Sequence, residues 1–91
     1  MKSHLSLKQK VARISEMPED VIMGIPVLTA LGNTNIQIEN YGGIIEYTDS
    51  LIRIRTKTGQ IMIKGKHLYV DYYTNDEMKL QGNINSIEFH H

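Results

Sequence analysis

The sequence contains no cysteine and no tryptophan, and it has only two prolines and one phenylalanine among its 91 residues. Without cysteine the chain has no disulfide framework, no Cys-ligated zinc site and no thiol nucleophile. Ten Lys and Arg balance ten Asp and Glu, so the composition indicates neither a polybasic nor a disordered chain. No apolar run approaches the roughly 18 residues that span a membrane, and the N-terminus lacks the apolar core of a signal peptide. A chain of this length is expected to form one small domain.

Residues 6–16 are predicted to form a short amphipathic helix. Leu7, Val11 and Ile14 recur at helical spacing, and basic residues occupy the other face. A single helix of about three turns is marginal on its own, so it must dock on something. We expect residues 1–20, the helix and a connector, to cover the core or a sheet edge. A helix that docks on a partner or a membrane surface is the open alternative.

From Val21 onward the apolar pattern has the two-residue period of β-strands, rich in Ile, Val, Thr and Tyr. Strands are expected at residues 25–31, 35–39, 43–48, 51–57, 60–65, 67–73, 77–81 and 84–90. The sequence therefore predicts a mainly β fold, a small antiparallel meander arranged as a roll, sandwich or partly open barrel with one N-terminal amphipathic helix. Residues 21–91 would form a single β domain.

Turn-forming residues suggest how these strands pair. Two-residue turns at Asp49-Ser50, Thr58-Gly59 and Gly65-Lys66 would bring four successive strands together. A further turn is expected at Gly82-Asn83. The four strands would share one apolar face, which consists of Ile45, Tyr47, Ile52, Ile54, Ile61, Ile63, Leu68 and Val70.

This register makes specific pairings. Ile54 would lie between Ile45 and Ile63 on neighbouring strands, and Arg53 would lie directly across from Lys64.

The alternation of apolar residues breaks at two later points. The first break follows Tyr72, where Met78 and Leu80 require an odd-length loop or a bulge. The second lies near Asn85, because the apolar residues on either side of it differ in parity.

A basic segment supplies the candidate interaction surface. Residues 53–66 contain five basic residues and no acid. The candidate interaction residues on the face opposite the apolar one are Arg53, Arg55, Lys64, His67 and Tyr69. One interpretation is a solvated face with cross-strand ion pairs such as Glu46–Arg53. The other is a docking surface for an anionic partner; the zero net charge and the lack of further exposed aromatic residues nearby argue against nucleic acid.

Sequence motifs of catalysis are missing, so we expect no enzyme, no cofactor and no metal site. The chain has no nucleophile elbow, phosphate-binding loop or dinucleotide fingerprint. His67 and Asp71 would stand about 13 Å apart on one strand, too far for a catalytic pair. His90-His91 suggest no third metal ligand, and whether they are native or derived from an affinity tag stays open.

Several segments resemble the YqfC branch of the YabP/YqfC family of sporulation proteins. The resemblance is carried by the stretch 38–49 (IENYGGIIEYTD), then IRIRT at 52–56, IKG at 63–65, LQG at 80–82 and SIEF at 86–89. It implies a non-enzymatic protein that contributes to spore-envelope formation. It also implies a membrane-protein partner, of the YqfD type in this branch and YabQ in the YabP branch. No catalytic residue is carried over from the family.

Two functions of different classes therefore remain. The first is a structural or assembly factor that binds protein partners through the basic face, an exposed strand edge or the N-terminal helix, with self-association expected. The second is a small β-roll that binds an anionic ligand, nucleic acid or an envelope polymer, through its basic hairpin face. The resemblance implies a cytoplasmic place in the sporulating cell, with a peripheral position at a forespore membrane as a further alternative.

Overall fold

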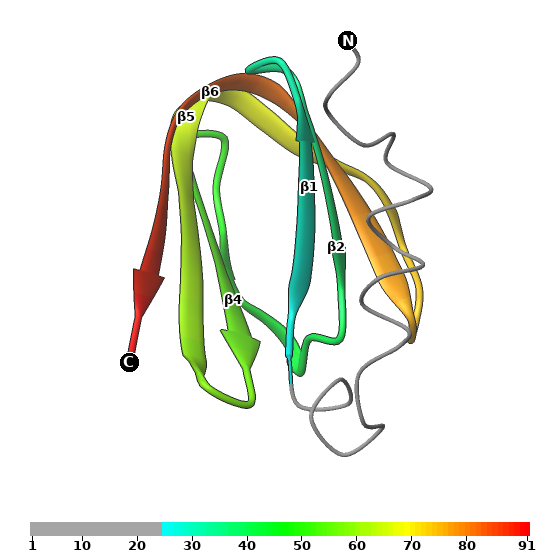
Figure 1. Cartoon of the computed structure of the whole chain (residues 1–91). Helices are drawn as coiled ribbons and strands as arrows, with labels where there is room; N and C mark the ends of the chain where they lie inside the picture. Colours follow the sequence, from blue (N-terminus) through cyan, green and yellow to red (C-terminus); the bar gives the residue numbers. More distant parts are fainter. Residues whose placement is uncertain (1–24) are drawn as a thin grey trace, which may run out of the picture.

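The structure is a computed structural model that describes residues 25–91 (Figure 1). These residues form six strands: β1 (Val27–Leu31), β2 (Asn35–Glu39), β3 (Gly43–Tyr47), β4 (Leu51–Thr56), β5 (Gly59–Tyr73) and β6 (Glu77–His90). The mainly β prediction is confirmed. The helix expected at 6–16 and its connector lie outside the described residues.

All six strands belong to one antiparallel sheet with the order β1-β2-β6-β5-β4-β3. Strands β3 to β6 follow one another as a meander, and the β1–β2 hairpin adds to β6 on its other side. The two long strands, β5 and β6, arch together over one end of the molecule (Figure 1). The sheet thereby folds over itself into two layers. We call the layer with β3 and β4 the first layer and the layer with β1 and β2 the second layer.

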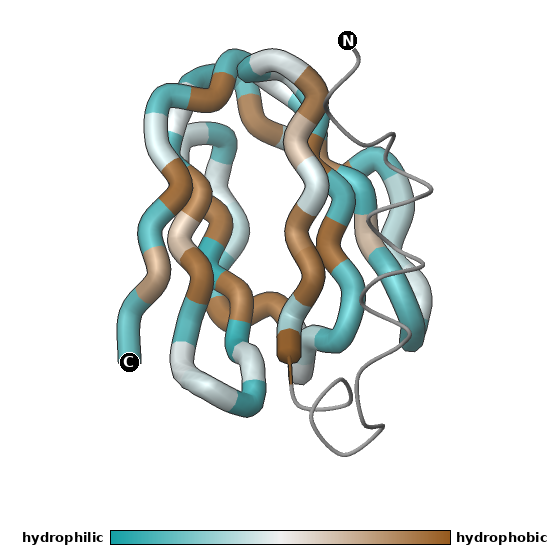
Figure 2. The backbone as a smooth tube through the Cα atoms, viewed as in Figure 1, coloured by the Kyte–Doolittle hydropathy of each residue, from teal (hydrophilic) through white to brown (hydrophobic). Residues whose placement is uncertain are grey.

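The core lies between these two layers. Apolar residues alternate with polar ones along most strands, as Figure 2 shows. The buried apolar residues are Ile36, Ile38, Ile52, Ile54, Ile61, Ile63, Leu68, Met78, Leu80 and Ile84. Five of them belong to the apolar face expected from the sequence, whereas the others come from β2 and β6. Isoleucine dominates because a branched side chain fits the pleated surface that two sheet layers enclose.

Strand β5 does not turn at Gly65-Lys66, so the predicted hairpin there is wrong. The strand continues through the bend to Tyr73. The bend interrupts the regular pairing of β5 with β6, but the β3–β4 turn supplies carbonyl acceptors for the backbone there. The Gly65 N–H donates to the Ser50 carbonyl at 3.1 Å, and the Leu68 N–H donates to the Asp49 carbonyl at 2.8 Å. Because these backbone donors are satisfied, the chain can bend here without reversing.

Strand β6 bends in the same way, and the turn expected at Gly82-Asn83 is also wrong. Here the β1–β2 turn supplies the acceptors. The Gly82 N–H donates to the Thr34 carbonyl at 3.2 Å, and the Ile84 N–H donates to the Asn33 carbonyl at 2.8 Å. Each hairpin therefore places its turn on the bend of one long strand.

The two bends require glycine because two backbones approach closely there. A Cβ at Gly65 would lie 2.0 Å from the Asn83 carbonyl oxygen, and a Cβ at Gly82 would lie 2.6 Å from the His67 carbonyl oxygen. Gly82 also has a φ of 142°, which side chains rarely adopt. These two glycines, which the sequence suggested as turn residues, instead allow the backbones of β5 and β6 to approach closely.

The observed register differs from the expected one on both sides of β4, with β3 beyond a bulge and with β5 throughout. A bulge between Ile44 and Glu46 pairs Ile44, rather than Ile45, with Ile54. The Ile45 side chain consequently faces outward and is 42% exposed, and Tyr47 is 51% exposed, so neither belongs to the core.

The β4–β5 turn comes one residue earlier than expected, at Lys57-Thr58. Ile54 therefore pairs with Ile61 instead of Ile63. Because the pairing partner changes by two residues, every side chain stays on the expected face of the sheet, and the apolar surface still forms.

Both expected breaks in the alternation are present, but the first lies just before Tyr72 and not after it as expected. The β5–β6 register shifts between Val70 and Tyr72. It shifts again between Lys64 and Gly65, where Asn85 is the extra residue on β6. Changes of parity in an apolar pattern thus located two real bulges.

Candidate docking surface

The five candidate interaction residues do not form one patch. Arg53 and Lys64 lie on the outer face of the first layer, and Arg55 lies near the end of β4. His67 lies in the bend of β5, where its φ is 55°. Tyr69 is on the second layer, where its hydroxyl donates to Gln81. The bend of β5, which the sequence concealed, separates the last two from the others.

Two basic residues of the first layer, Arg53 and Lys64, are paired with acids. Arg53 lies across from Met62, not from Lys64 as expected. Arg53 Nη2 is 3.3 Å from Glu46 Oε1, and Lys64 Nζ is 3.2 Å from Glu88 Oε2. The expected Glu46–Arg53 ion pair is thus present. Most of this face carries little surplus positive charge.

Glu88 is at the centre of a small polar group at the C-terminal part of β6. His90 Nε2 lies 3.0 Å from Glu88 Oε1, on the other side of the carboxylate from Lys64. Hydrogen bonds with His90 and then with Lys64 lower the pKa of Glu88 below its ordinary value. The carboxylate therefore stays charged at lower pH than a free glutamate, although such an exposed pair stabilises a fold only weakly.

Arg55 differs from the other two because it has no ion pair with an acid among residues 25–91. Its side chain lies over Gly42 and Gly43: a Cβ at Gly42 would be 3.3 Å from Arg55 Nε, and one at Gly43 would be 3.5 Å from Arg55 Nη2. The Tyr73 hydroxyl comes within 3.8 Å of the same point at Gly43. The Arg55 guanidinium group therefore lies directly against the two glycines, with the Tyr73 hydroxyl beside it.

Tyr73 in turn stacks on Tyr41. The ring centroids are 5.6 Å apart with an interplanar angle of 26°, a favourable offset arrangement. The Tyr41 hydroxyl donates to the Thr74 carbonyl. Burial, and then the neighbouring Tyr73, raise the pKa of Tyr41, so its phenol is neutral at physiological pH. The stack joins the β2–β3 connection to the end of β5.

Two adjoining surface hollows share Arg55, Thr56 and Lys57. One extends to Tyr41 and the other towards the histidines at the end of the chain. We call the surface formed by Tyr41, Arg55, Lys57 and Tyr73 the Arg55 end. It combines two cations with two tyrosines, of which Tyr73 is 51% exposed.

Sequence reasoning found Arg55 but missed the tyrosines of this surface. Lys57 was within the basic segment, so its charge was visible in the sequence. Tyr41 and Tyr73 are far apart in the chain, and only the folding of the sheet brings them together. Their aromatic character was the sole available signal, and it equally fits packing within a strand.

The outer face of the second layer carries a different, polar network. Gln37 Nε2 donates to Glu77 Oε2 at 2.9 Å and to the Tyr72 hydroxyl at 3.3 Å. Gln81 Nε2 donates to Asn35 Oδ1 at 2.7 Å. Because these side chains satisfy one another, the network fits a structural role in holding β2, β5 and β6 in register.

Residues 25–91 contain neither a metal-binding cluster nor a membrane-spanning helix. No cluster of three or more His, Asp or Glu side chains there could hold a metal ion. Nor does that part of the chain contain a helix long and apolar enough to cross a membrane.

The chain matches the model of one known protein family. The model of the YabP family matches residues 26–91, which is nearly all of the described sheet. The chain belongs to the YabP family. The resemblance seen in the sequence is thereby confirmed, and the matched region includes His90 and His91.

One relative in this family is the uncharacterized protein YqfC of Bacillus subtilis strain 168. It is 31% identical over 83 residues, covering 91% of this chain and 89% of the relative. No solved structure is significantly similar to the chain.

Proposed function

We propose that this YabP-family protein is a non-enzymatic assembly factor in spore-envelope formation, and that it binds a membrane-protein partner of the YqfD type through the Arg55 end. The observation that carries the proposal is the combination of Arg55 and Lys57 with the stacked Tyr41 and Tyr73. Arginine and tyrosine are enriched at protein interfaces, where they supply large contact areas and hydrogen bonds together.

Charge distribution supports this surface over the rest of the basic segment. Arg53 and Lys64 already have acidic partners within the sheet, whereas Arg55 and Lys57 have none among residues 25–91. A partner with acidic residues would therefore be attracted most strongly to the Arg55 end. We place the protein on the cytoplasmic side of a forespore membrane, where such a partner would present an acidic loop.

The proposal is tested by co-expressing the tagged protein with the membrane protein and capturing it from detergent-solubilised membranes. The double variant Arg55→Glu, Lys57→Glu should capture at least tenfold less of the membrane protein, because both attractive charges become repulsive. Arg53→Glu with Lys64→Glu is the matched control, since it makes the same charge change on the same sheet and should retain capture.

Both double variants should unfold at temperatures close to that of the wild type, since the substituted residues are partly or fully exposed. Equal capture by both double variants would refute the assignment of the Arg55 end as the interface.

The alternative function is binding of an anionic polymer at the same cations. The adjoining hollows lined by Arg55 and Lys57 favour it. Salt distinguishes the two functions: polyanion binding should weaken steeply between low and physiological salt, whereas a contact that also buries Tyr41 and Tyr73 should persist. Binding of purified protein to an anionic polymer, measured across a salt series, separates them.

A further inference from the structure

The C-terminal part of β6 is an open edge of the sheet. Residues Glu77 to Gln81 of β6 pair with β2 on one side and with β5 on the other. From Asn83 to His90 the strand pairs only with β5 among the described strands. Beyond Ile84, whose N–H donates to the Asn33 carbonyl, its other side therefore presents backbone N–H and C=O groups that another strand could bind.

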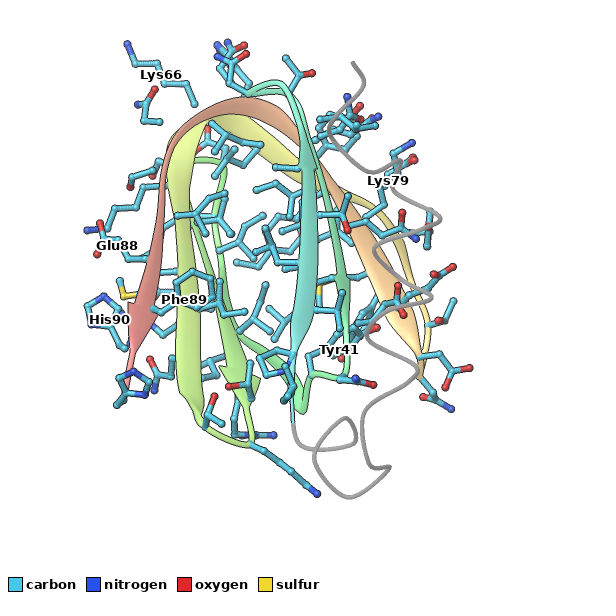
Figure 3. All side chains as sticks on the ribbon, in the orientation of Figure 1. Tyr41, Lys66, Lys79, Glu88, Phe89 and His90 are labelled. Carbon is cyan, nitrogen blue, oxygen red and sulfur yellow. The ribbon has the colours of Figure 1, made fainter. Side chains whose placement is uncertain are left out.

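This edge also exposes an aromatic residue on the core side of the sheet. Phe89 lies across from the buried Ile61, yet it is 59% exposed because the edge is not covered. Ile87, two residues earlier, packs against the core and is only partly buried. Figure 3 shows Phe89 on the opposite side of the strand from Glu88 and His90. Charged or proline residues usually protect such edges, but the core-facing side of this one has neither.

We propose that two copies of this protein associate through antiparallel pairing of these edges, with Phe89 of each copy at the two-fold axis. In an isologous contact one surface serves both copies, so a residue on the axis meets itself. Phe89 would then contact Phe89 of the second copy as a cross-strand aromatic pair. On the outer face Glu88 would lie opposite His90 of the second copy, and this acid–base contact occurs twice.

The neighbouring registers are less favourable. Core-facing side chains must meet core-facing side chains, so the pairing can shift only in steps of two residues. One step places Glu88 opposite Glu88 of the second copy, which sets like charges against each other. The next places Phe89 opposite Asn85, the extra residue of the bulge. Charge thus disfavours the first of these registers and loss of the apolar contact of Phe89 disfavours the second, which leaves the register centred on Phe89.

This dimer uses none of the four residues of the Arg55 end, although His90 also lines the hollow that extends from Arg55 and Lys57. It does not rest on the function proposed for that surface. Its contact is short, because regular pairing extends only from about Ile87 to the end of the strand. We therefore expect a reversible dimer that forms as the protein concentration rises, as small interfaces usually do.

The absence of cysteine in the chain makes the proposal directly testable. In Phe89→Cys the two sulfur atoms would face each other across the axis, within the separation that a disulfide spans. Mild oxidation of the full-length protein should give a covalent dimer at least tenfold faster than oxidation of Leu31→Cys. Leu31 lies on the edge strand β1 and is more exposed, at 65%, so exposure alone predicts the reverse order.

Sedimentation velocity of the unmodified chain and two further variants completes the test. The wild type should shift from monomer to dimer across a concentration series, and Phe89→Lys should stay monomeric with an unchanged melting temperature. Leu31→Lys should dimerise like the wild type. A wild type that remains monomeric throughout, or oxidation that is equally fast at Leu31→Cys, would overturn the proposal. Faster oxidation of Ile87→Cys than of Phe89→Cys would overturn the register.

Discussion

Arg53 and Arg55 stand two positions apart on β4 and have different surroundings. Arg53 contacts Glu46 through one nitrogen, Nη2, while its buried Nε has no acceptor among the described residues. Arg55 extends over two glycines towards an exposed tyrosine. The same residue type therefore serves the sheet at one position and is available to a partner at the other. The difference between the two arginines arises from the residues of other segments that surround each side chain.

Gly65 offers a sharp test of the bend in β5. Gly65→Ala should destabilise the protein by about 3 kcal/mol, because its Cβ would lie 2.0 Å from a backbone oxygen of β6, which cannot move like a side chain. Gly32→Asn is the control. Gly32 has a φ of 59° and open space around it, and asparagine tolerates this conformation. Urea unfolding of both variants should show a clear loss only for Gly65→Ala; equal stability would contradict the close approach of the two strands.

At the scale of the element, strand β4 shows how alternation separates core from surface. Ile52 and Ile54 are fully buried, whereas Arg53 and Arg55 between and beyond them face water. This assignment was predictable because a period of two is specified by the sequence itself. The pairing partner was not predictable to better than two residues, since turns of different position preserve the same faces.

The two faces of β4 predict opposite outcomes for one substitution. Ile54→Asp should cost at least about 4 kcal/mol, enough to unfold a small domain, because it puts an unpaired charge into the core. Arg55→Asp, one residue along, should leave the fold intact. Circular dichroism melts of the two variants check this, and the face assignment fails if Arg55→Asp unfolds as readily as Ile54→Asp.

Strands β5 and β6 show what local patterns could not reveal. The dipeptides Gly65-Lys66 and Gly82-Asn83 are typical of hairpin turns, so the local sequence predicts a turn at each. The chain continues instead because turns from other hairpins supply acceptors to the bent strands. Those acceptors are distant in sequence, so no local pattern could have indicated them.

At the scale of the whole molecule, residues 25–91 contain a continuous core. The buried residues come from β2, β4, β5 and β6, and the two layers enclose them. The sheet folds back on itself, and the Tyr47 hydroxyl accepts a hydrogen bond from the Val70 N–H at 2.8 Å, joining the two layers. A core of this kind should not require the first segment of the chain in order to form.

Deletion of residues 1–16 is therefore expected to leave the sheet folded with reduced stability. The loss would reflect any apolar surface that Leu7, Val11 and Ile14 cover in the full chain. A far-ultraviolet circular dichroism spectrum and a dispersed amide NMR spectrum of the truncated protein would check this. Capture of the membrane partner should persist, because the Arg55 end lies within residues 25–91. An unfolded truncated protein would show that the segment belongs to the core.

The sequence by itself determined the mainly β class, most strand positions, the buried face of β4, the two bulges and the relationship to the YabP family. The structural features follow from side-chain period and local composition, which a strand specifies residue by residue. The family relationship follows instead from the resemblance of particular segments to known members. Only the tertiary structure decided that β5 and β6 are single bent strands, that Tyr41 and Tyr73 join Arg55, and that Phe89 remains exposed at an open edge. Each of these depends on contacts between segments far apart in the chain, whose energies no local pattern contains.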